Sequence, residues 1–284
     1  MYDLYKALFA ELLGSFLLVF VGASSVALTV GSGGSTVGNA LSFGLAYTAL
    51  IYILNGYSGS HFNPAVSFGF AITGRLGWCR MLLYWLAQIL GAVLAGLLVA
   101  WIYGFDSSFA PGGDLSFEQP WKVVVLEMIL TFFLVLTFLF VTKNPSLSIM
   151  SGLIIGAVLI SDVLVGGYLA KIGVNPAYAI ATNLLSGNWA NIWIYILGPL
   201  LGALLAGLLY KSLTLPWTCV EIANDPCGKT CFDMPFAEIW KECVSEGDVI
   251  LKAPQRQFEK ECAPCGEPRY EPRRSGRSSK YIPL

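Results

Sequence analysis

Charged side chains are scarce in this chain, and histidine is almost missing. Only 12% of its 284 residues are Asp, Glu, Lys or Arg, whereas soluble domains usually carry about 25%. The formal net charge is −1, which excludes the basic stripe expected of a nucleic-acid-binding protein. His61 is the single histidine, and no acid–base or nucleophile pair stands at a plausible spacing, so the sequence argues against an enzyme.

The few charges are distributed unevenly along the chain. Residues 1–211 hold seven basic and seven acidic side chains, whereas the much shorter stretch 212–284 holds ten and eleven. The mean hydropathy of the whole chain is +0.66. A long apolar body with a polar tail is typical of integral membrane proteins. We therefore predict a membrane domain over 1–211 and a cysteine-containing cytoplasmic tail over 212–284.

The apolar body divides into long and short apolar segments. A helix needs about 20 apolar residues to cross the hydrocarbon, and the first such run is too long for a cleaved signal peptide. The segments 62–74 and 173–186 are too short to span. The predicted spans are 7–30, 39–56, 81–103, 121–142, 148–170 and 190–210. The sequence thus predicts an all-α membrane protein with six transmembrane helices and two re-entrant half-helices.

The chain repeats itself at a nearly constant spacing. Leu90–Leu98 reads LGAVLAGLL and Leu201–Leu209 reads LGALLAGLL, and a similar interval separates Glu11 from Glu127. These landmarks indicate a duplicated unit of three spans and a half-span. Because three is odd, the second copy must enter from the opposite side, which makes the repeats inverted. The two copies are expected over about 7–103 and about 121–211.

The distribution of basic residues predicts the orientation. If both ends lie inside, the cytoplasmic connections of the membrane domain carry five Lys or Arg and the outer ones carry two. The positive-inside bias therefore favours cytoplasmic termini, in the plasma membrane or an intracellular membrane.

Each short apolar segment contains the triplet Asn-Pro-Ala. Asn is a strong helix N-cap, and Pro is favoured at the first helical position, so each triplet predicts a helix start. Two such starts from opposite sides put two positive dipole ends at the bilayer centre, which favours neutral solutes over cations and protons. The alternative is two helix caps in ordinary loops. The triplets are Asn63-Pro64-Ala65 and Asn175-Pro176-Ala177.

These features resemble the aquaporin family, also called the major intrinsic proteins, over residues 7–211. The resemblance rests on the two triplets, on Ala10–Gly14 in the first span, on Ser58–Val66 around the first triplet, and on Trp85–Gln88. It implies a right-handed six-helix bundle that assembles as a homotetramer in the lipid bilayer. Each subunit would hold one pore for water and small neutral solutes and would need no cofactor.

Family members usually carry a second filter outside the triplets, with an Arg directly after the second motif. In this chain that position is Tyr178, and the other filter positions correspond to Phe43, Val163 and Ile172. Tyr offers one hydroxyl where Arg offers up to five donors and a positive charge. Two alternatives to a water pore stay open: relaxed selectivity for ammonia, glycerol, peroxide or ions, and a closed pore with a structural or adhesion role. Ala179 replaces the Asp usual in glycerol-conducting members, which argues against glycerol.

Four ionisable residues of the membrane domain are candidate site residues. By the resemblance, Glu11 and Glu127 accept hydrogen bonds from the half-helix loops, which we prefer to a proton relay. His61 is expected to line the cytoplasmic vestibule, with a pH-responsive gate as the alternative. Asp162 either shapes the water or attracts cations near the filter, or it caps a local backbone break, faces a vestibule or is protonated.

The tail contains six of the seven cysteines. Cys227 and Cys231, and Cys262 and Cys265, have the spacing of zinc-ligand pairs. The alternative, which we prefer, is reduced thiols without a metal.

Overall fold

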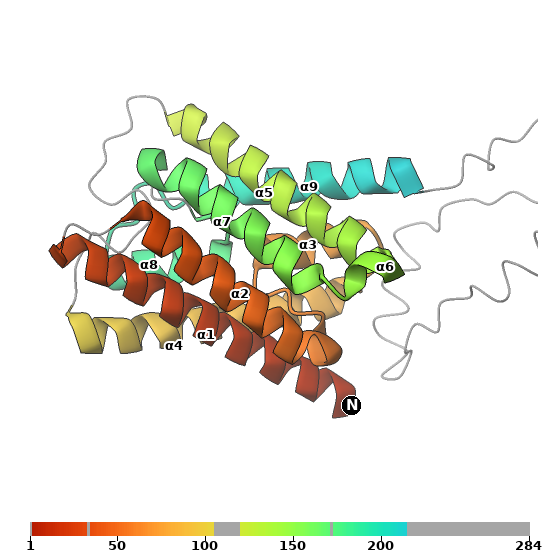
Figure 1. Ribbon diagram of the computed structural model, residues 1–284, viewed down its shortest axis with the longest axis horizontal. Helices are drawn as coiled ribbons and strands as arrows, with labels where there is room; N and C mark the ends of the chain where they lie inside the picture. Colours follow the sequence, from red (N-terminus) through yellow and green to blue (C-terminus); the bar gives the residue numbers. More distant parts are fainter. Residues whose placement is uncertain (1, 33–34, 105–119, 171–172, 215–284) are drawn as a thin grey trace, which may run out of the picture. The chain divides into compact units, whose positions relative to one another are not determined.

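A computed structural model of the chain describes residues 2–32, 35–104, 120–170 and 173–214, and these residues form helices without any strand (Figure 1). The helices are α1 (Tyr2–Ser32), α2 (Thr36–Ser58), α3 (Pro64–Ile72), α4 (Trp78–Tyr103), α5 (Pro120–Lys143), α6 (Pro145–Ser148), α7 (Ser151–Ala170), α8 (Pro176–Ser186) and α9 (Ile194–Thr214). The predicted all-α class is confirmed. Nearly all of the predicted tail, 212–284, lies outside the described residues.

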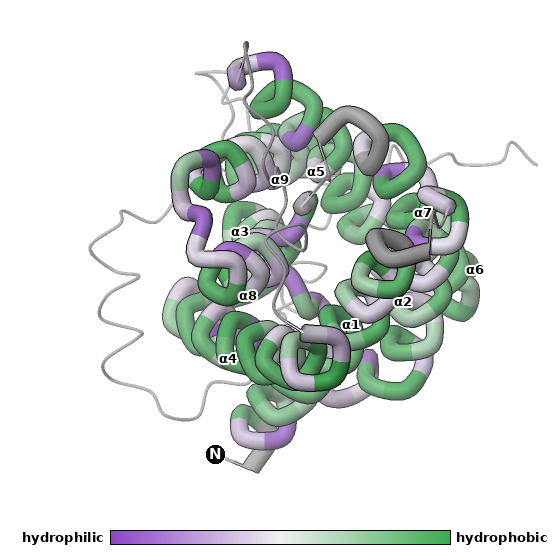
Figure 2. Tube along the Cα trace, turned by 90° about the vertical axis from the view of Figure 1, so that its left-hand side faces the viewer, coloured by the Kyte–Doolittle hydropathy of each residue, from purple (hydrophilic) through white to green (hydrophobic). Residues whose placement is uncertain are grey.

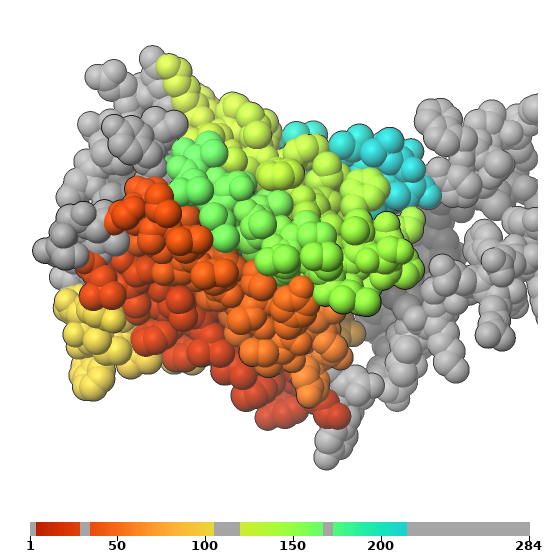
Figure 3. All heavy atoms as spheres, in the orientation of Figure 1, coloured from red at the N-terminus to blue at the C-terminus, as the bar shows by residue number. Residues whose placement is uncertain are grey.

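The long helices have the length and composition of membrane spans. Within the described residues, α1, α2, α4, α5 and α9 are long and apolar enough to cross a bilayer, and Ser151–Gly166 of α7 forms a shorter apolar helix. Large apolar side chains such as Leu86, Trp101 and Ile53 are exposed on their outer faces. The space-filling view shows these helices packed side by side (Figure 3). Such an apolar surface suits lipid as its solvent.

Two matched helix pairs show the duplication predicted from the sequence. α1 packs along α4, and α5 packs along α9. At the first crossing, a side chain on Gly91 would meet the backbone of Leu12 and Phe16. At the second, a side chain on Gly202 would meet the backbone of Met128 and Phe132. Glycine is needed at both crossings because each helix backbone lies directly against its partner.

A third crossing joins the two copies to each other. α2 packs along α7, and here Gly44 and Gly156 lie backbone to backbone. A side chain on Gly44 would meet Ile160 and the Gly156 carbonyl, and one on Gly156 would meet Thr48 and the Gly44 carbonyl. The contacts are therefore reciprocal, and the two glycines stand at the same sequence spacing as the two Asn-Pro-Ala triplets. This reciprocity is what a pseudo-twofold relation between inverted copies requires.

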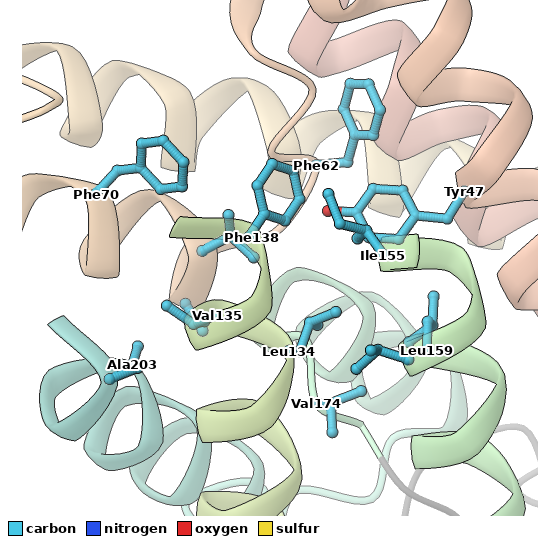
Figure 4. Close-up of a cluster of buried hydrophobic side chains, with 14 of the residues drawn as sticks. Tyr47, Phe62, Phe70, Leu134, Val135, Phe138, Ile155, Leu159, Val174 and Ala203 are labelled. Atoms are coloured by element: carbon cyan, nitrogen blue, oxygen red, sulfur yellow. The ribbon is translucent and has the colours of Figure 1, made fainter. Parts of the chain in front are cut away.

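The interior is filled by apolar side chains from both copies. Tyr47 and Phe62 of the first copy and Leu134, Phe138 and Ile155 of the second belong to one buried cluster (Figure 4). α3 and α8 lie among the longer helices in the view of Figure 2. The half-helices are thereby placed where the two copies meet.

Candidate functional site: the junction of the two half-helices

The two Asn-Pro-Ala triplets begin the two half-helices. Asn63 has an extended backbone, and its Oδ1 accepts a hydrogen bond from the Ala65 N–H at 2.9 Å. Asn175 does the same for the Ala177 N–H at 3.0 Å. Pro64 and Pro176 occupy the first helical positions, where a missing N–H costs no hydrogen bond. The capping geometry that the sequence predicts is present at both ends.

The tips of the two half-helices are bonded to each other. Asn63 Nδ2 donates to the Val174 carbonyl at 2.8 Å, and Asn175 Nδ2 donates to the Phe62 carbonyl at 3.0 Å. Each Asn therefore caps its own helix with its oxygen and holds the opposite loop with its amide. Each amide has two hydrogens, and one of them is used in the junction.

Phe62 and Val174, directly before the two Asn residues, have left-handed backbones. Their φ angles are +46° and +35°, which are unfavourable for bulky side chains. Their carbonyls accept the Asn amides, while their N–H groups donate to Glu11 and Glu127. Strain of this kind persists only where the surroundings hold it from several sides.

The two intramembrane glutamates hold the half-helix loops. Glu11 Oε1 accepts from the His61 N–H at 3.0 Å, and its Oε2 accepts from the Phe62 N–H at 2.7 Å. Glu127 Oε1 and Oε2 accept from the Gly173 and Val174 N–H groups, each at 2.8 Å. Backbone groups that lipid cannot satisfy are thus bonded inside the protein.

The first loop has additional side-chain contacts without counterparts among the described residues of the second loop. Tyr47 Oη donates to the His61 carbonyl at 2.6 Å, and Trp85 Nε1 donates to the Pro64 carbonyl at 2.9 Å. Gln88 Nε2 lies 2.7 Å from Glu11 Oε2 and 2.9 Å from Ser67 Oγ. The sequence alone does not identify Tyr47 and Ser67 as part of the site. Trp85 and Gln88 were noted in the sequence only for the family resemblance.

His61 lies inside the first loop. Its Nδ1 is 3.1 Å from Ser67 Oγ, and its ring contacts Phe70 at a centroid distance of 4.4 Å. Phe138 lies beside both rings. The histidine is buried, and its role in a vestibule stays a prediction.

Three of the four residues of the predicted outer filter lie within the described part of the chain. The rings of Phe43 and Tyr178 touch edge to face at a centroid distance of 5.4 Å. The Phe43 ring fits only because position 22 is glycine, where a side chain would overlap it. Val163 is half-buried and packs against the buried cluster that contains Tyr47 and Phe138. Ile172 lies outside the described residues.

Asp162 is fully buried on α7, and within the described part of the chain neither of its carboxylate oxygens has a hydrogen-bond partner. No group of metal-ligating residues occurs within the described part of the chain. The four cysteines considered for zinc, Cys227, Cys231, Cys262 and Cys265, lie outside it.

Comparison with known proteins identifies the family to which the chain belongs. Residues 1–210 match the family described as major intrinsic protein. The chain belongs to the major intrinsic protein family. It is 34% identical over 211 residues to Aquaporin NIP1-1 of Zea mays, covering 73% of this chain and 74% of that protein. It is 36% identical to Aquaporin TIP4-4 of Zea mays, covering 73% and 86%.

A solved structure has the same fold. The aquaglyceroporin from Plasmodium falciparum superposes with a TM-score of 0.66 over 75% of this chain and 98% of its own, at 23% sequence identity. Membership of the major intrinsic protein family makes the chain an integral membrane protein and a passive channel for water or small solutes, not an enzyme.

Proposed function

We propose that the chain conducts water and other small uncharged solutes past Asn63 and Asn175 and excludes cations and protons. The observation that carries this proposal is the reciprocal bonding of the two Asn side chains across the junction. Each Asn keeps one amide hydrogen that can donate to a passing oxygen or nitrogen atom. A cation at the same place meets the positive ends of α3 and α8, both of which point at the junction.

The proposal extends to the surroundings of the pore. Both termini would be cytoplasmic, with residues 1–211 as the channel and 212–284 as a tail. The membrane would be the plasma membrane or an intracellular one, and four copies would assemble with one pore each. The basic residues at the proposed inner ends of the helices, among them Arg75 and Lys143, support this orientation.

The outer filter of this pore would be aromatic. Tyr178 of α8 and Phe43 of α2 are in edge-to-face contact, which supports a narrow passage that admits only small solutes. Without the usual Arg, this filter has one fewer fixed positive charge. The pore would then rely on the half-helix dipoles to exclude cations.

Substitution of Tyr178 tests the filter. Stopped-flow light scattering on proteoliposomes gives the rates for water, urea and glycerol. Tyr178→Ala removes one ring of the aromatic contact and widens the passage, so we expect glycerol and urea permeability to rise about tenfold or more relative to water. Tyr57→Ala is the matched control, because Tyr57 is exposed on the outer face of α2 and should leave every rate unchanged.

The same measurement distinguishes an open pore from a second candidate, a closed pore with a structural or adhesion role. The contact between Phe43 and Tyr178 favours this second candidate. If these rings close the pore, the unaltered protein passes no solute, and Tyr178→Ala opens it. If Tyr178→Ala and Tyr178→Arg both leave the rate and the range of solutes unchanged, Tyr178 is not part of the filter.

A further inference from the structure

Asp162 lies on the inward face of α7, and the described residues provide no partner for its charge. The residue has 0% of its surface exposed, and both carboxylate oxygens lack a hydrogen bond. The charged group facing it among the described residues is Glu127, another acid. Both oxygens of Glu127 already accept backbone N–H groups. A charged carboxylate that is buried alone is very costly, so Asp162 needs either a proton or a bound cation to balance its charge.

A second unsatisfied oxygen lies across from it on α5. Thr131 is fully buried, and its Oγ1 has no hydrogen-bond partner among the described residues. Leu134 of α5 and Leu159 of α7 belong to the same buried cluster and are drawn facing each other (Figure 4). Thr131 comes three positions before Leu134, and Asp162 three positions after Leu159. In antiparallel helices both steps run about 4.5 Å in the same direction, which places the two oxygen groups at one depth.

The equivalent place in the first copy is apolar. The reciprocal contacts of Gly44 and Gly156 relate α2 to α7, and the same sequence spacing pairs Asp162 with Leu50. Leu50 is buried in the core. Leucine therefore fills the equivalent position in the first copy by apolar packing alone. Asp162 is an addition to the second copy that packing does not explain.

We propose that Asp162 and Thr131 bind one alkali cation between α5 and α7. Carboxylate and hydroxyl oxygens are hard ligands that suit such cations. A single free carboxylate is too little for Ca²⁺, which takes six to eight oxygen ligands and usually several carboxylates. Glu127 lies nearby, and each of its oxygens accepts one backbone N–H. This inference goes beyond the proposed function, because the site lies between helices and does not depend on which solute permeates.

Thermal unfolding of the purified full-length protein tests the site. Unfolding midpoints are compared in NaCl, KCl and choline chloride at equal ionic strength, so that only specific binding differs. A cation that binds the folded state alone raises the midpoint in proportion to the logarithm of its concentration above Kd. We expect a rise of about 5 °C in NaCl or KCl over choline chloride.

Variants assign the effect to these residues. Asp162→Asn should abolish the difference between the salts, and Thr131→Val should weaken the apparent affinity about tenfold. Ser15→Ala is the matched control, because Ser15 is the buried α1 hydroxyl that corresponds to Thr131 at the spacing of Glu11 and Glu127. It should keep the full alkali effect. Equal midpoints in all three salts for the unaltered protein, or an alkali effect that survives in Asp162→Asn, would overturn the proposal.

Discussion

At the scale of single residues, the junction depends on side chains that each make two kinds of bond. Asn63 and Asn175 cap their own half-helices with Oδ1 and hold the opposite loop with Nδ2. Leucine at either position would lose both bonds, and aspartate would lose the donor. The Asn side chain is therefore required for its oxygen and its nitrogen together. The glutamates complete the same loops from behind.

The two glutamates should differ in importance. Glu127→Gln replaces one acceptor oxygen with an N–H donor that faces a backbone N–H, so we expect a loss of about 1–3 kcal/mol in the free energy of unfolding. Glu11→Gln should cost less, because Tyr47 and Trp85 also hold the first loop. Thermal unfolding of the two variants, together with their water permeability, measures the difference. An equal loss in both variants, or a larger loss in Glu11→Gln, contradicts this explanation.

At the scale of elements, three close helix crossings hold the half-helices in place. The crossings of α1 with α4 and of α5 with α9 lie within the copies, and the crossing of α2 with α7 joins them. Each relies on glycine where two backbones meet, as is common between membrane helices. The junction of the half-helices is therefore sensitive to packing several turns away.

Gly156→Ala tests the crossing between the copies. The added methyl group would overlap Thr48 Oγ1 and lie 2.6 Å from the Gly44 carbonyl, so the helices must separate. We expect a loss of about 1–3 kcal/mol in the free energy of unfolding, with reduced flux. Gly56→Ala on α2 is the control, since nothing lies within 4 Å of its added carbon. Alanine there should be neutral or stabilise by about 0.5–1 kcal/mol. Similar unfolding midpoints for both variants would show that the crossing is not tight.

The elements also show what the sequence could predict. The short segment predicted at 62–74 contains α3, Pro64–Ile72, and the one predicted at 173–186 contains α8, Pro176–Ser186, because Asn-Pro marks a helix start. The first long helix begins earlier than the predicted 7–30, because a helix continues past the apolar run that predicts it. The bonds among Gln88, Ser67 and Glu11 were not predicted, since composition and spacing do not show which polar side chains meet.

At the scale of the whole molecule, two inverted copies each supply a half-helix, and the half-helices meet inside the membrane. The reciprocal backbone contacts, the paired glutamates and the crossed Asn bonds all relate the first copy to the second. Two positive helix ends that meet at one point favour neutral solutes over cations and protons.

The most direct test measures water and proton flux on the same proteoliposomes. Osmotic shrinkage is recorded by stopped-flow light scattering, and proton entry is recorded with a trapped pH dye under a pH gradient. We predict shrinkage about tenfold or more faster than in protein-free vesicles, with proton entry at the protein-free rate. Shrinkage no faster than in empty vesicles, for both the unaltered protein and Tyr178→Ala, or proton entry that rises with the amount of protein, would contradict this prediction.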